Sequence, residues 1–436
     1  MPKTVFIMTT LGAAAIWIAL GVWLPWWLIA VAVAASAIWL VATPAGRRTG
    51  SITVAGIATL PQRLGGASVA LVGIAGVVGV LIALLAMGNG FQATLQATGS
   101  DDTAIVLSLD SPSEISSVLD QSSVRLMGHE PQVMRDAQGR PIASSELLSV
   151  VSLPDESNGL VAGVSLRGVR PEVWALRPNV KIIAGRRFHV GLRELIVGKD
   201  AAQEFAHTSI GSTLDLDGEP WKVVGKFDSG DAYNSELWAD TNVVATTFHR
   251  GSNTNALTVR LESAKQFDIF KAALASDPQL HVEAHTTRAY YADQAKDLTK
   301  LIRVLGSIVA AIMGVGAVAG ALNSMYSAVS ARTREIATLR AIGFRGGPVV
   351  ISVMIETMLL ALVGGVVGAG VAWLLFDNYT ASTVGPNFNE MVFQFRVSPA
   401  LLGSGLRLAL VIGFLGGLFP ALRAARMPVA DALRKL

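Results

Sequence analysis

The chain has 436 residues, of which 51% are apolar and only 15% are charged. A soluble domain typically carries about 25% charged residues, so this deficit and the mean hydropathy of +0.49 indicate a membrane protein. Residues 99–300 hold 27 acidic and 20 basic side chains, whereas the rest of the chain holds 5 and 15. The positive excess flanks apolar runs, which argues against nucleic-acid binding. Cysteine is absent, which excludes disulfides, thiolate metal sites and cysteine nucleophiles.

Several apolar runs are long enough to cross a bilayer, which takes about 20 residues in a helix. The predicted spans are residues 5–24, 26–42, 68–91, 301–328, 348–376 and 401–422. Pro25 and the tryptophans around it predict a turn at a membrane surface between the first two spans. A secretory signal peptide is the alternative for the N-terminus, although a second apolar run directly behind the first favours a transmembrane hairpin.

The basic residues predict the orientation of these spans. They fall on one side of the membrane, while the short loop at 377–400 on the other side carries only Arg396. The positive-inside rule therefore predicts that both termini are cytoplasmic and that residues 92–300 lie outside the cytoplasm.

Residues 99–286 have the pattern of a folded α+β domain. Short β-type runs are followed by the helical run Ala264–Ala275, and Ser111 to Glu114 has the pattern of a helix start. The predicted strands cover Thr103–Leu109, Leu147–Leu153, Trp221–Phe227 and Ala256–Leu261. Thr287 to Ala328 contains no proline, so we predict one helix of about 63 Å, about half of which projects from the bilayer as a stalk.

The chain lacks the sequence patterns of common catalytic sites. There is no Walker A sequence, because Gly198-Lys199-Asp200 lacks the glycine loop and the Ser or Thr that would hold magnesium. His281 and His285 are four residues apart in an apparent strand or loop, so neither a metal site nor a catalytic residue is predicted.

The predicted spans contain glycine pairs and two notable polar residues. The pairs Gly316/Gly320, Gly364/Gly368 and Gly413/Gly417 are each spaced by four, which predicts close packing of helices. Asn323 is predicted to hydrogen-bond another helix. Glu356 is predicted to bond a neighbouring helix end near the cytoplasmic interface, with a proton relay as the alternative.

Residues 330–345 predict a short cytoplasmic helix that ends at Gly343. Ile336, Leu339 and Ile342 form an apolar stripe, and the chain has no large cytoplasmic domain to bury it. A separate subunit or the membrane surface should therefore cover the stripe. The predicted docking residues are Arg334, Glu335, Ile336, Leu339, Arg340, Ile342, Gly343 and Phe344.

At these positions the sequence resembles the MacB/FtsX-like permeases of ABC transporters. The motifs that carry the resemblance are Asn323, Arg332-Thr333-Arg334-Glu335-Ile336, Leu339-Arg340-Ala341-Ile342-Gly343, Ile355-Glu356-Thr357-Met358-Leu359-Leu360, Gly364-Gly365, Pro420-Ala421-Leu422-Arg423 and Pro428-Val429-Ala430-Asp431. Similar motifs of the outer domain are Gly185-Arg186-Arg187-Phe188, Glu194-Leu195-Ile196-Val197-Gly198 and Val223-Val224-Gly225-Lys226-Phe227.

The resemblance implies an α-helical polytopic protein of the bacterial inner membrane, with a four-span core and a large α+β periplasmic domain between core spans one and two. Residues 1–45 add a hairpin that the family pattern lacks. The predicted division is 1–45 hairpin, 46–67 cytoplasmic segment, 68–98 core span one and stalk, 99–286 periplasmic MacB-like domain, 287–328 stalk and core span two, 329–347 coupling helix, 348–376 core span three, 377–400 periplasmic loop, 401–422 core span four and 423–436 cytoplasmic tail.

The resemblance also implies a permease subunit that is not itself an enzyme. Two copies of a separate ABC ATPase would hold ATP and magnesium and drive mechanotransmission to the periplasmic domain, and this chain would bind no cofactor. A second copy or a sister permease, membrane lipid, and for efflux a periplasmic adaptor and an outer-membrane exit duct are the expected partners. The alternatives are a signalling or scaffold subunit and a membrane-anchored enzyme, although no catalytic constellation supports the last of these.

Overall fold

The computed structural model describes residues 41–58, 64–342, 346–385 and 390–426, together with positions 34 and 38. The chain divides into two compact units. The helical unit comprises residues 1–87, 302–378 and 396–436, and the sheet unit comprises 88–301 and 379–395. The predicted spans at 5–24 and 26–42 lie almost entirely outside the described residues, so the count of six spans stays a prediction.

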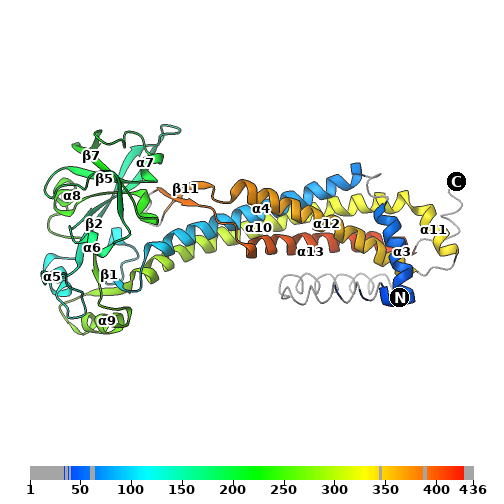
Figure 1. Ribbon diagram of the computed structural model, residues 1–436, viewed down its shortest axis with the longest axis horizontal. Coiled ribbons are helices and arrows are strands. Elements are labelled where there is room, and N and C mark those ends of the chain that lie inside the picture. The colour runs from blue at the N-terminus through cyan, green and yellow to red at the C-terminus, as the bar shows by residue number, and fades with distance from the viewer. Residues whose placement is uncertain are drawn as a thin grey trace. The chain divides into compact units, whose positions relative to one another are not determined.

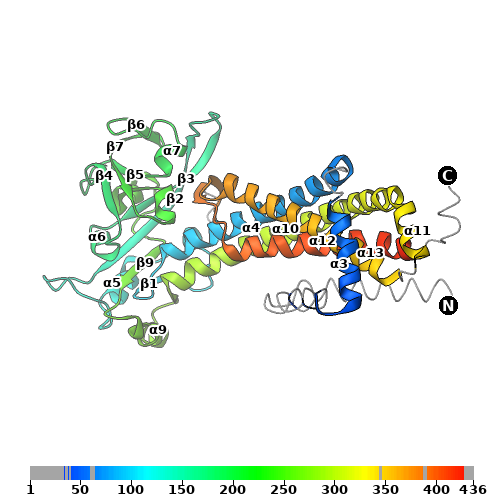
Figure 2. The same ribbon diagram turned by 45° about the vertical axis from the view of Figure 1, so that its right-hand side comes forward.

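Long apolar helices make up the helical unit. The helices that contribute to it are α3 (Pro44–Ala58), α4 (Leu64–Thr98), α10 (Thr287–Ala331), α11 (Thr333–Ala341), α12 (Gly346–Phe376) and α13 (Pro399–Arg426). In the described part of the chain, four helices are long and apolar enough to cross a membrane, namely α4, α10, α12 and α13. They match the four predicted core spans and lie side by side in both views (Figures 1 and 2). The prediction of a single helix from Thr287 is confirmed.

Small residues allow three of these helices to pack closely. A Cβ on Gly368 of α12 would lie 2.3 Å from the carbonyl oxygen of Ala75 in α4. A Cβ on Gly413 of α13 would lie 2.4 Å from the Cβ of Ala361 in α12. Real Cβ atoms essentially never come this close to another atom, so only glycine fits at both positions without a shift. The structure thus brings the backbones of α4, α12 and α13 together at these glycines.

The other members of the predicted glycine pairs behave differently from one another. Gly364 meets Leu71 and Ile74, and Gly417 meets Thr357, so both lie in helix contacts. Among the residues that the structure describes, a Cβ on Gly316 or Gly320 of α10 would meet nothing within 4 Å, and Gly316 is exposed. The described helices therefore do not pack on this pair, because α10 turns another face towards them, and packing of Gly316 and Gly320 against another helix stays a prediction.

One ten-stranded mixed sheet forms the centre of the sheet unit. Its order is β10-β1-β9-β2-β3-β8-β5-β7-β4, with β6 paired to β7. The strands are β1 (Thr103–Ser108), β2 (Ala143–Pro154), β3 (Val161–Val169), β4 (Lys181–Gly185), β5 (Glu194–Gly198), β6 (Thr213–Leu216), β7 (Glu219–Asp228), β8 (Glu236–Asp240), β9 (Ala256–Arg260) and β10 (Val282–Thr286). The pairs β3/β8 and β5/β7 are parallel. The four predicted strands are confirmed as β1, β2, β7 and β9.

Short helices cover the sheet and divide its core in two. These helices are α5 (Gln121–Gly128), α6 (Val173–Leu176), α7 (Ala201–Glu204), α8 (Thr241–Thr247), α9 (Phe267–Ser276) and the 3-10 turns η2 (Glu114–Ser116), η3 (Ala232–Ser235) and η4 (Ala264–Gln266). One core cluster includes Trp221, Leu237 and Val244, and the other includes Val106, Leu257 and Phe270. The predicted helical run at Ala264–Ala275 is present as η4 and α9.

Two predictions for local structure need correction. The helix predicted to start at Ser111–Glu114 is only the single turn η2, because Glu114 points into the core and is 1% exposed. The helix starts later, at Gln121, where the Asp120 carboxylate accepts hydrogen bonds from the backbone N–H groups of Ser122 and Ser123. The segment predicted as a loop at 377–400 contains a hairpin, β11 (Thr380–Val384) and β12 (Glu390–Gln394).

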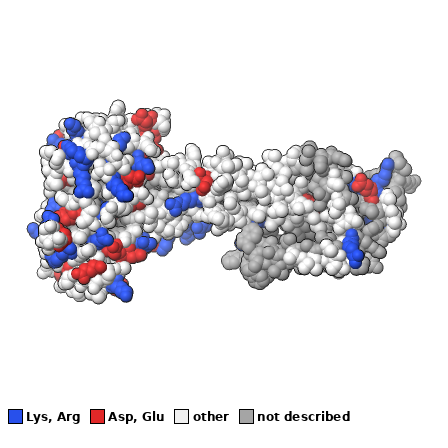
Figure 3. Space-filling view, viewed as in Figure 1, with Lys and Arg blue, Asp and Glu red and all other residues white. Residues whose placement is uncertain are grey.

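Charged side chains are concentrated on the sheet unit. On the face shown in Figure 3, many Lys, Arg, Asp and Glu side chains lie on the described part of this unit and few lie on the described part of the long helices. This distribution is consistent with the charge difference found in the sequence.

Candidate functional site

The predicted coupling helix is α11, which follows the long helix α10. Arg334 and Glu335 are exposed, and Ile342 just after α11 is 72% exposed. Ile336 is buried, however, and packs in a cluster with Val329, Val349 and other residues of α10, α12 and α13. The prediction that Ile336 docks a separate subunit is therefore wrong, because the chain itself covers this part of the stripe. The side chain of Leu339, and the whole of Gly343 and Phe344, lie outside the described residues.

A buried ion pair connects α12 to the junction of α10 and α11. The Arg332 Nη1 atom donates to the Glu356 Oε2 atom at 2.9 Å, and the two side chains are 11% and 4% exposed. The predicted bond between Glu356 and a neighbouring helix end is present. Asn323, by contrast, is exposed, and its side chain makes no hydrogen bond with another span in the part of the chain that the structure describes.

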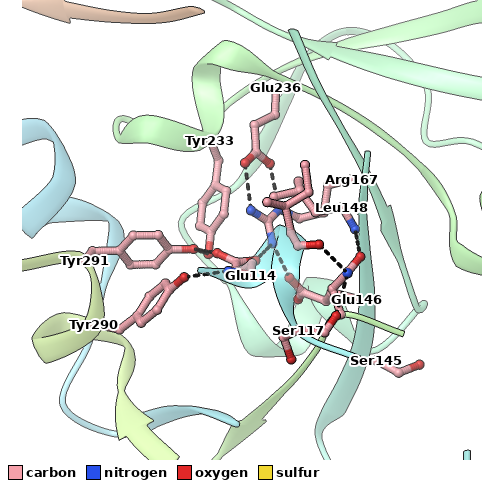
Figure 4. Close-up of polar contacts among 12 residues, drawn as sticks. Glu114, Ser117, Ser145, Glu146, Leu148, Arg167, Tyr233, Glu236, Tyr290 and Tyr291 are labelled. Atoms are coloured by element: carbon pink, nitrogen blue, oxygen red, sulfur yellow. Dashed lines mark hydrogen bonds and ion pairs between the residues drawn. The ribbon is translucent and has the colours of Figure 1, made fainter. Parts of the chain in front are cut away.

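A second polar network lies in the core of the sheet unit and is centred on Arg167 of β3 (Figure 4). The Arg167 Nε and Nη2 atoms donate to the two carboxylate oxygens of Glu236 at 2.7 and 2.8 Å. Its Nη1 atom donates to Glu114 at 2.5 Å and to Glu146 at 2.8 Å. Arg177 donates to Glu146 and its Cζ atom lies 4.3 Å from the centre of the Tyr233 ring. Five charges thus pair with one another away from solvent.

Tyrosine hydroxyls connect this network to the first turn of α10. The Tyr291 hydroxyl donates to the Glu114 carboxylate at 3.2 Å, and the Tyr290 hydroxyl accepts from the Glu114 backbone N–H at 3.0 Å. The hydroxyls of Tyr233 and Tyr291 are 2.9 Å apart. Figure 4 shows these three rings on one side of Glu114. The start of α10 is therefore fixed to both η2 and η3.

Burial and pairing shift the pKa values of several groups in this network. Burial raises the pKa of each of Tyr233, Tyr290 and Tyr291 above its usual value. Burial alone would also raise the pKa of the Glu146 carboxyl, but the cations of Arg177 and Arg167 outweigh it and hold that pKa below its usual value. The three hydroxyls therefore stay neutral and the Glu146 carboxyl stays charged at neutral pH, which suits a structural link rather than proton transfer.

The backbone at the start of α10 is also fixed to the end of α4. The Ser100 N–H donates to the Thr287 Oγ1 atom at 2.8 Å, and the Arg288 N–H donates to the Ser100 carbonyl oxygen at 3.3 Å. A Cβ on Gly99 would lie 2.3 Å from the Arg288 nitrogen. Only glycine allows the two chain segments to come this close.

One group among the described residues places three potential metal ligands together. Carboxylate oxygens of Asp155, Glu204 and Glu390 lie within 4.8 Å of one another. The Asp155 Oδ1 atom already accepts from Ser157 and Asn158. Burial, and then the charges of Glu204 and Asp155, raise the pKa of Glu390. The three groups are all carboxylates, and those of Asp155 and Glu390 come from segments far apart in sequence.

The sequence reasoning missed the Arg167 network. Arg167 interrupts the apolar run Val161–Val169, and Glu236 is the first residue of strand β8. A lone charge inside a β-type run is unusual unless it is exposed or paired, so two opposite charges in two such runs are a usable signal. The partners Glu114 and Tyr291 could not be found in this way, because they lie in a turn and a helix.

The fold is thus that of a membrane protein in which four apolar helices accompany a large mixed sheet unit. Residues 307–429 match the family model of the FtsX-like permease C-terminal region, and residues 67–277 match the MacB-like periplasmic core domain. The chain belongs to the MacB/FtsX-like family of ABC transporter permeases. It is accordingly a multi-pass membrane protein with an extracytoplasmic domain.

Two relatives are about a quarter identical to this chain over the residues that align. The chain is 26% identical over 275 residues to the uncharacterized ABC transporter permease YknZ of Bacillus subtilis, covering 59% of this chain and 66% of YknZ. It is 26% identical over 291 residues to the macrolide export ATP-binding/permease protein MacB of Neisseria gonorrhoeae, covering 62% of this chain and 43% of MacB. The matches thus span less than two thirds of either relative.

Solved structures also resemble part of the chain. The extracellular domain of YknZ from Gram-positive bacteria matches 42% of this chain and 100% of its own, at 16% identity and a TM-score of 0.33. The periplasmic region of MacB from Actinobacillus actinomycetemcomitans matches 43% of this chain and 90% of its own, at 12% identity and a TM-score of 0.33.

Proposed function

We propose that this chain is the permease subunit of an ABC transporter complex in which a separate ATPase moves the sheet unit for export or for work in the cell envelope. The observation that carries the proposal is the family membership together with α10. This single helix of 45 residues runs from the sheet unit to α11 without a break. A continuous helix of this length extends about 68 Å and can pass a displacement from one end to the other.

The ATPase is expected to bind near α11. Ile342 is 72% exposed, and Arg334 and Glu335 nearby are also exposed. An apolar anchor surrounded by charges is the pattern of a protein interface. ATP and magnesium would be held by two copies of the ATPase, since this chain contains no Walker A sequence. Leu339, Arg340, Gly343 and Phe344 remain proposed members of the docking surface.

A second permease copy is proposed to pack on the exposed face of α10. Leu305, Ile308, Ile312 and Val315 are between 51% and 73% exposed and follow one another at intervals of three and four residues. This is the spacing of a coiled-coil seam, and Gly316 beside it would let a partner helix approach closely. A sister permease would use the same face. Lipid would cover it in an isolated monomer.

The proposal places the chain in a bacterial inner membrane with both termini in the cytoplasm. For efflux, a periplasmic adaptor and an outer-membrane exit duct would complete the assembly. A signalling or scaffold subunit would need neither of them, so co-purification of an adaptor with the intact complex distinguishes these two roles.

The test is capture of the cognate ATPase by the detergent-solubilised full chain. Ile342→Asp should weaken capture by at least about tenfold, because burying an apolar anchor contributes about 1–3 kcal/mol and an unpaired carboxylate opposes burial. The matched control is Leu160→Asp, since Leu160 is also exposed but belongs to the sheet unit. Unchanged capture and ATP hydrolysis with Ile342→Asp would overturn docking at this site.

A further inference from the structure

Three segments of the sheet unit that lead to the long helices meet at one short turn, η3. At its start, the Ala232 N–H donates to the Thr98 Oγ1 atom at the end of α4, at 3.1 Å. In its middle, the Tyr233 hydroxyl lies 2.9 Å from the Tyr291 hydroxyl at the start of α10. At its end, the Ser235 Oγ atom accepts from the Val392 N–H of β12 at 2.9 Å, and β12 precedes α13.

The turn η3 is itself held firmly inside the sheet unit. The Asp231 Oδ1 atom caps it by accepting from the Tyr233 N–H at 3.0 Å, and the Asn234 Oδ1 atom accepts from the Ser229 N–H at 2.7 Å. Tyr233, Asn234 and Ser235 are all buried. A Cβ on Gly198 of β5 would lie 2.2 Å from the Asn234 carbonyl oxygen, so the turn lies directly against that strand.

The turn also continues into the charged network. Glu236, the first residue of β8, directly follows η3 and forms the bidentate ion pair with Arg167 of β3. A displacement of η3 must therefore move β8 and β3, which are central strands of the sheet. Breaking such a buried, hydrogen-bonded pair is costly, so the strands follow the turn instead of separating from it.

We propose that η3 is the joint that makes the sheet unit follow the membrane helices, with Tyr233 and Ser235 as positioning residues. This inference rests on the proposed function. One attachment would let a domain pivot, whereas three attachments to different segments fix its orientation. Each of the three uses one hydroxyl group, of Thr98, Tyr233 or Ser235, so each can be removed with a nearly isosteric side chain.

The chain contains no cysteine, which permits specific labelling. Leu160 of the sheet unit and Leu374 of α12 are both exposed, and Leu160→Cys with Leu374→Cys would carry two spin labels. The full chain with its ATPase is reconstituted in lipid nanodiscs. Pulsed electron paramagnetic resonance then measures the distance between the two labels, without nucleotide and with ATP trapped by vanadate. The joint variant combines Thr98→Val, Tyr233→Phe and Ser235→Ala. Its control combines the same changes at exposed sites, Thr246→Val, Tyr379→Phe and Ser276→Ala.

The joint variant should broaden the nucleotide-free distance distribution at least twofold relative to the control and should lose at least half of the ATP-dependent shift, at an unchanged rate of ATP hydrolysis. Distance distributions of equal width in the joint variant and the control would overturn the proposal that η3 is the joint. An absence of any ATP-dependent shift in the parent would overturn the proposed function, while the widths would still decide on the joint. If the triple variant does not assemble, each of the three single variants is measured against its matching single control. Distance distributions of equal width in every such pair would overturn the proposal that η3 is the joint.

Discussion

Replacing Arg167 by methionine tests whether the buried network stabilises the sheet unit. The Arg167 side chain is 2% exposed and is the cation shared by Glu114, Glu146 and Glu236. Methionine has a similar length and no charge, so Arg167→Met would leave these carboxylates with fewer partners. Glu146 would keep Arg177, but Glu114 and Glu236 would lose their ion pairs. Removing one partner of a buried ion pair typically costs about 3–5 kcal/mol.

This cost is large relative to the stability of a domain, which is about 5–15 kcal/mol. For a unit of about 200 residues, each kcal/mol lowers the melting temperature by about 2–4 °C, so a fall of about 6–20 °C is expected. Thermal unfolding of the full chain in nanodiscs, followed by hydrogen exchange of β3 and β8, measures it. The two strands should lose protection together, because Arg167 and Glu236 join them.

The same substitution at a surface ion pair provides the control. Arg140 forms a 2.8 Å ion pair with Asp136, but its side chain is 65% exposed. Exposed pairs contribute about 0–1 kcal/mol, so Arg140→Met should change the melting temperature by no more than about 4 °C. Equal effects of Arg167→Met and Arg140→Met would refute the argument that burial makes the Arg167 network costly to break.

Two further predictions concern pH and helix packing. Burial raises the pKa of Asp231 from 3.8 to about 6, so the folded protein holds this proton more tightly than the unfolded chain does. Proton binding at Asp231 therefore adds to the free energy of unfolding in full below about pH 4, and this contribution is lost as the pH rises through 6. Asp231→Asn should keep the cap of η3 and remove about 3 kcal/mol of this pH dependence. If the melting temperatures of both proteins change with pH in the same way from about pH 4 to 8, this prediction is wrong. Gly368→Leu should prevent folding of the helical unit by overpacking against α4, whereas Gly316→Leu should leave the monomer intact and reduce dimer formation. Light scattering of detergent-solubilised protein measures this, and a stable Gly368→Leu monomer is the contrary result.

The spans and the long helix could be predicted because their signals are local. A run of about 20 apolar residues is enough to indicate a span, and α10 needs only the absence of proline and a continuous helical pattern. Strands β1, β2, β7 and β9 were also visible as short β-type runs. Each of these features depends on residues that are close together in the sequence.

The parts that were missed depend on residues far apart in the sequence. The sequence pattern places Ile336 on an apolar stripe with no visible partner. In the structure, Val349, Val353 and Ala424, which follow later in the chain, pack against it. Whether Gly316 lies in a helix contact depends on which face of α10 the other helices pack against. Only β12 of the short hairpin β11–β12 is buried, and it lies against η3, where the Ser235 Oγ atom accepts from the Val392 N–H. No local pattern contains this information.

Stability alone does not account for a buried network of five charges. Replacing such groups with well-packed apolar residues is often neutral or stabilising, so an apolar core could hold the sheet together as well. Apolar contacts, however, have no direction and allow neighbouring segments to slide, whereas the two-pronged bond of Arg167 to Glu236 and the hydroxyl bond of Tyr291 to Glu114 each require one geometry. Directional bonds at the start of α10 are therefore what a protein needs if the orientation of its sheet unit must follow one helix, and the same bonds make the orientation sensitive to the loss of a single oxygen atom.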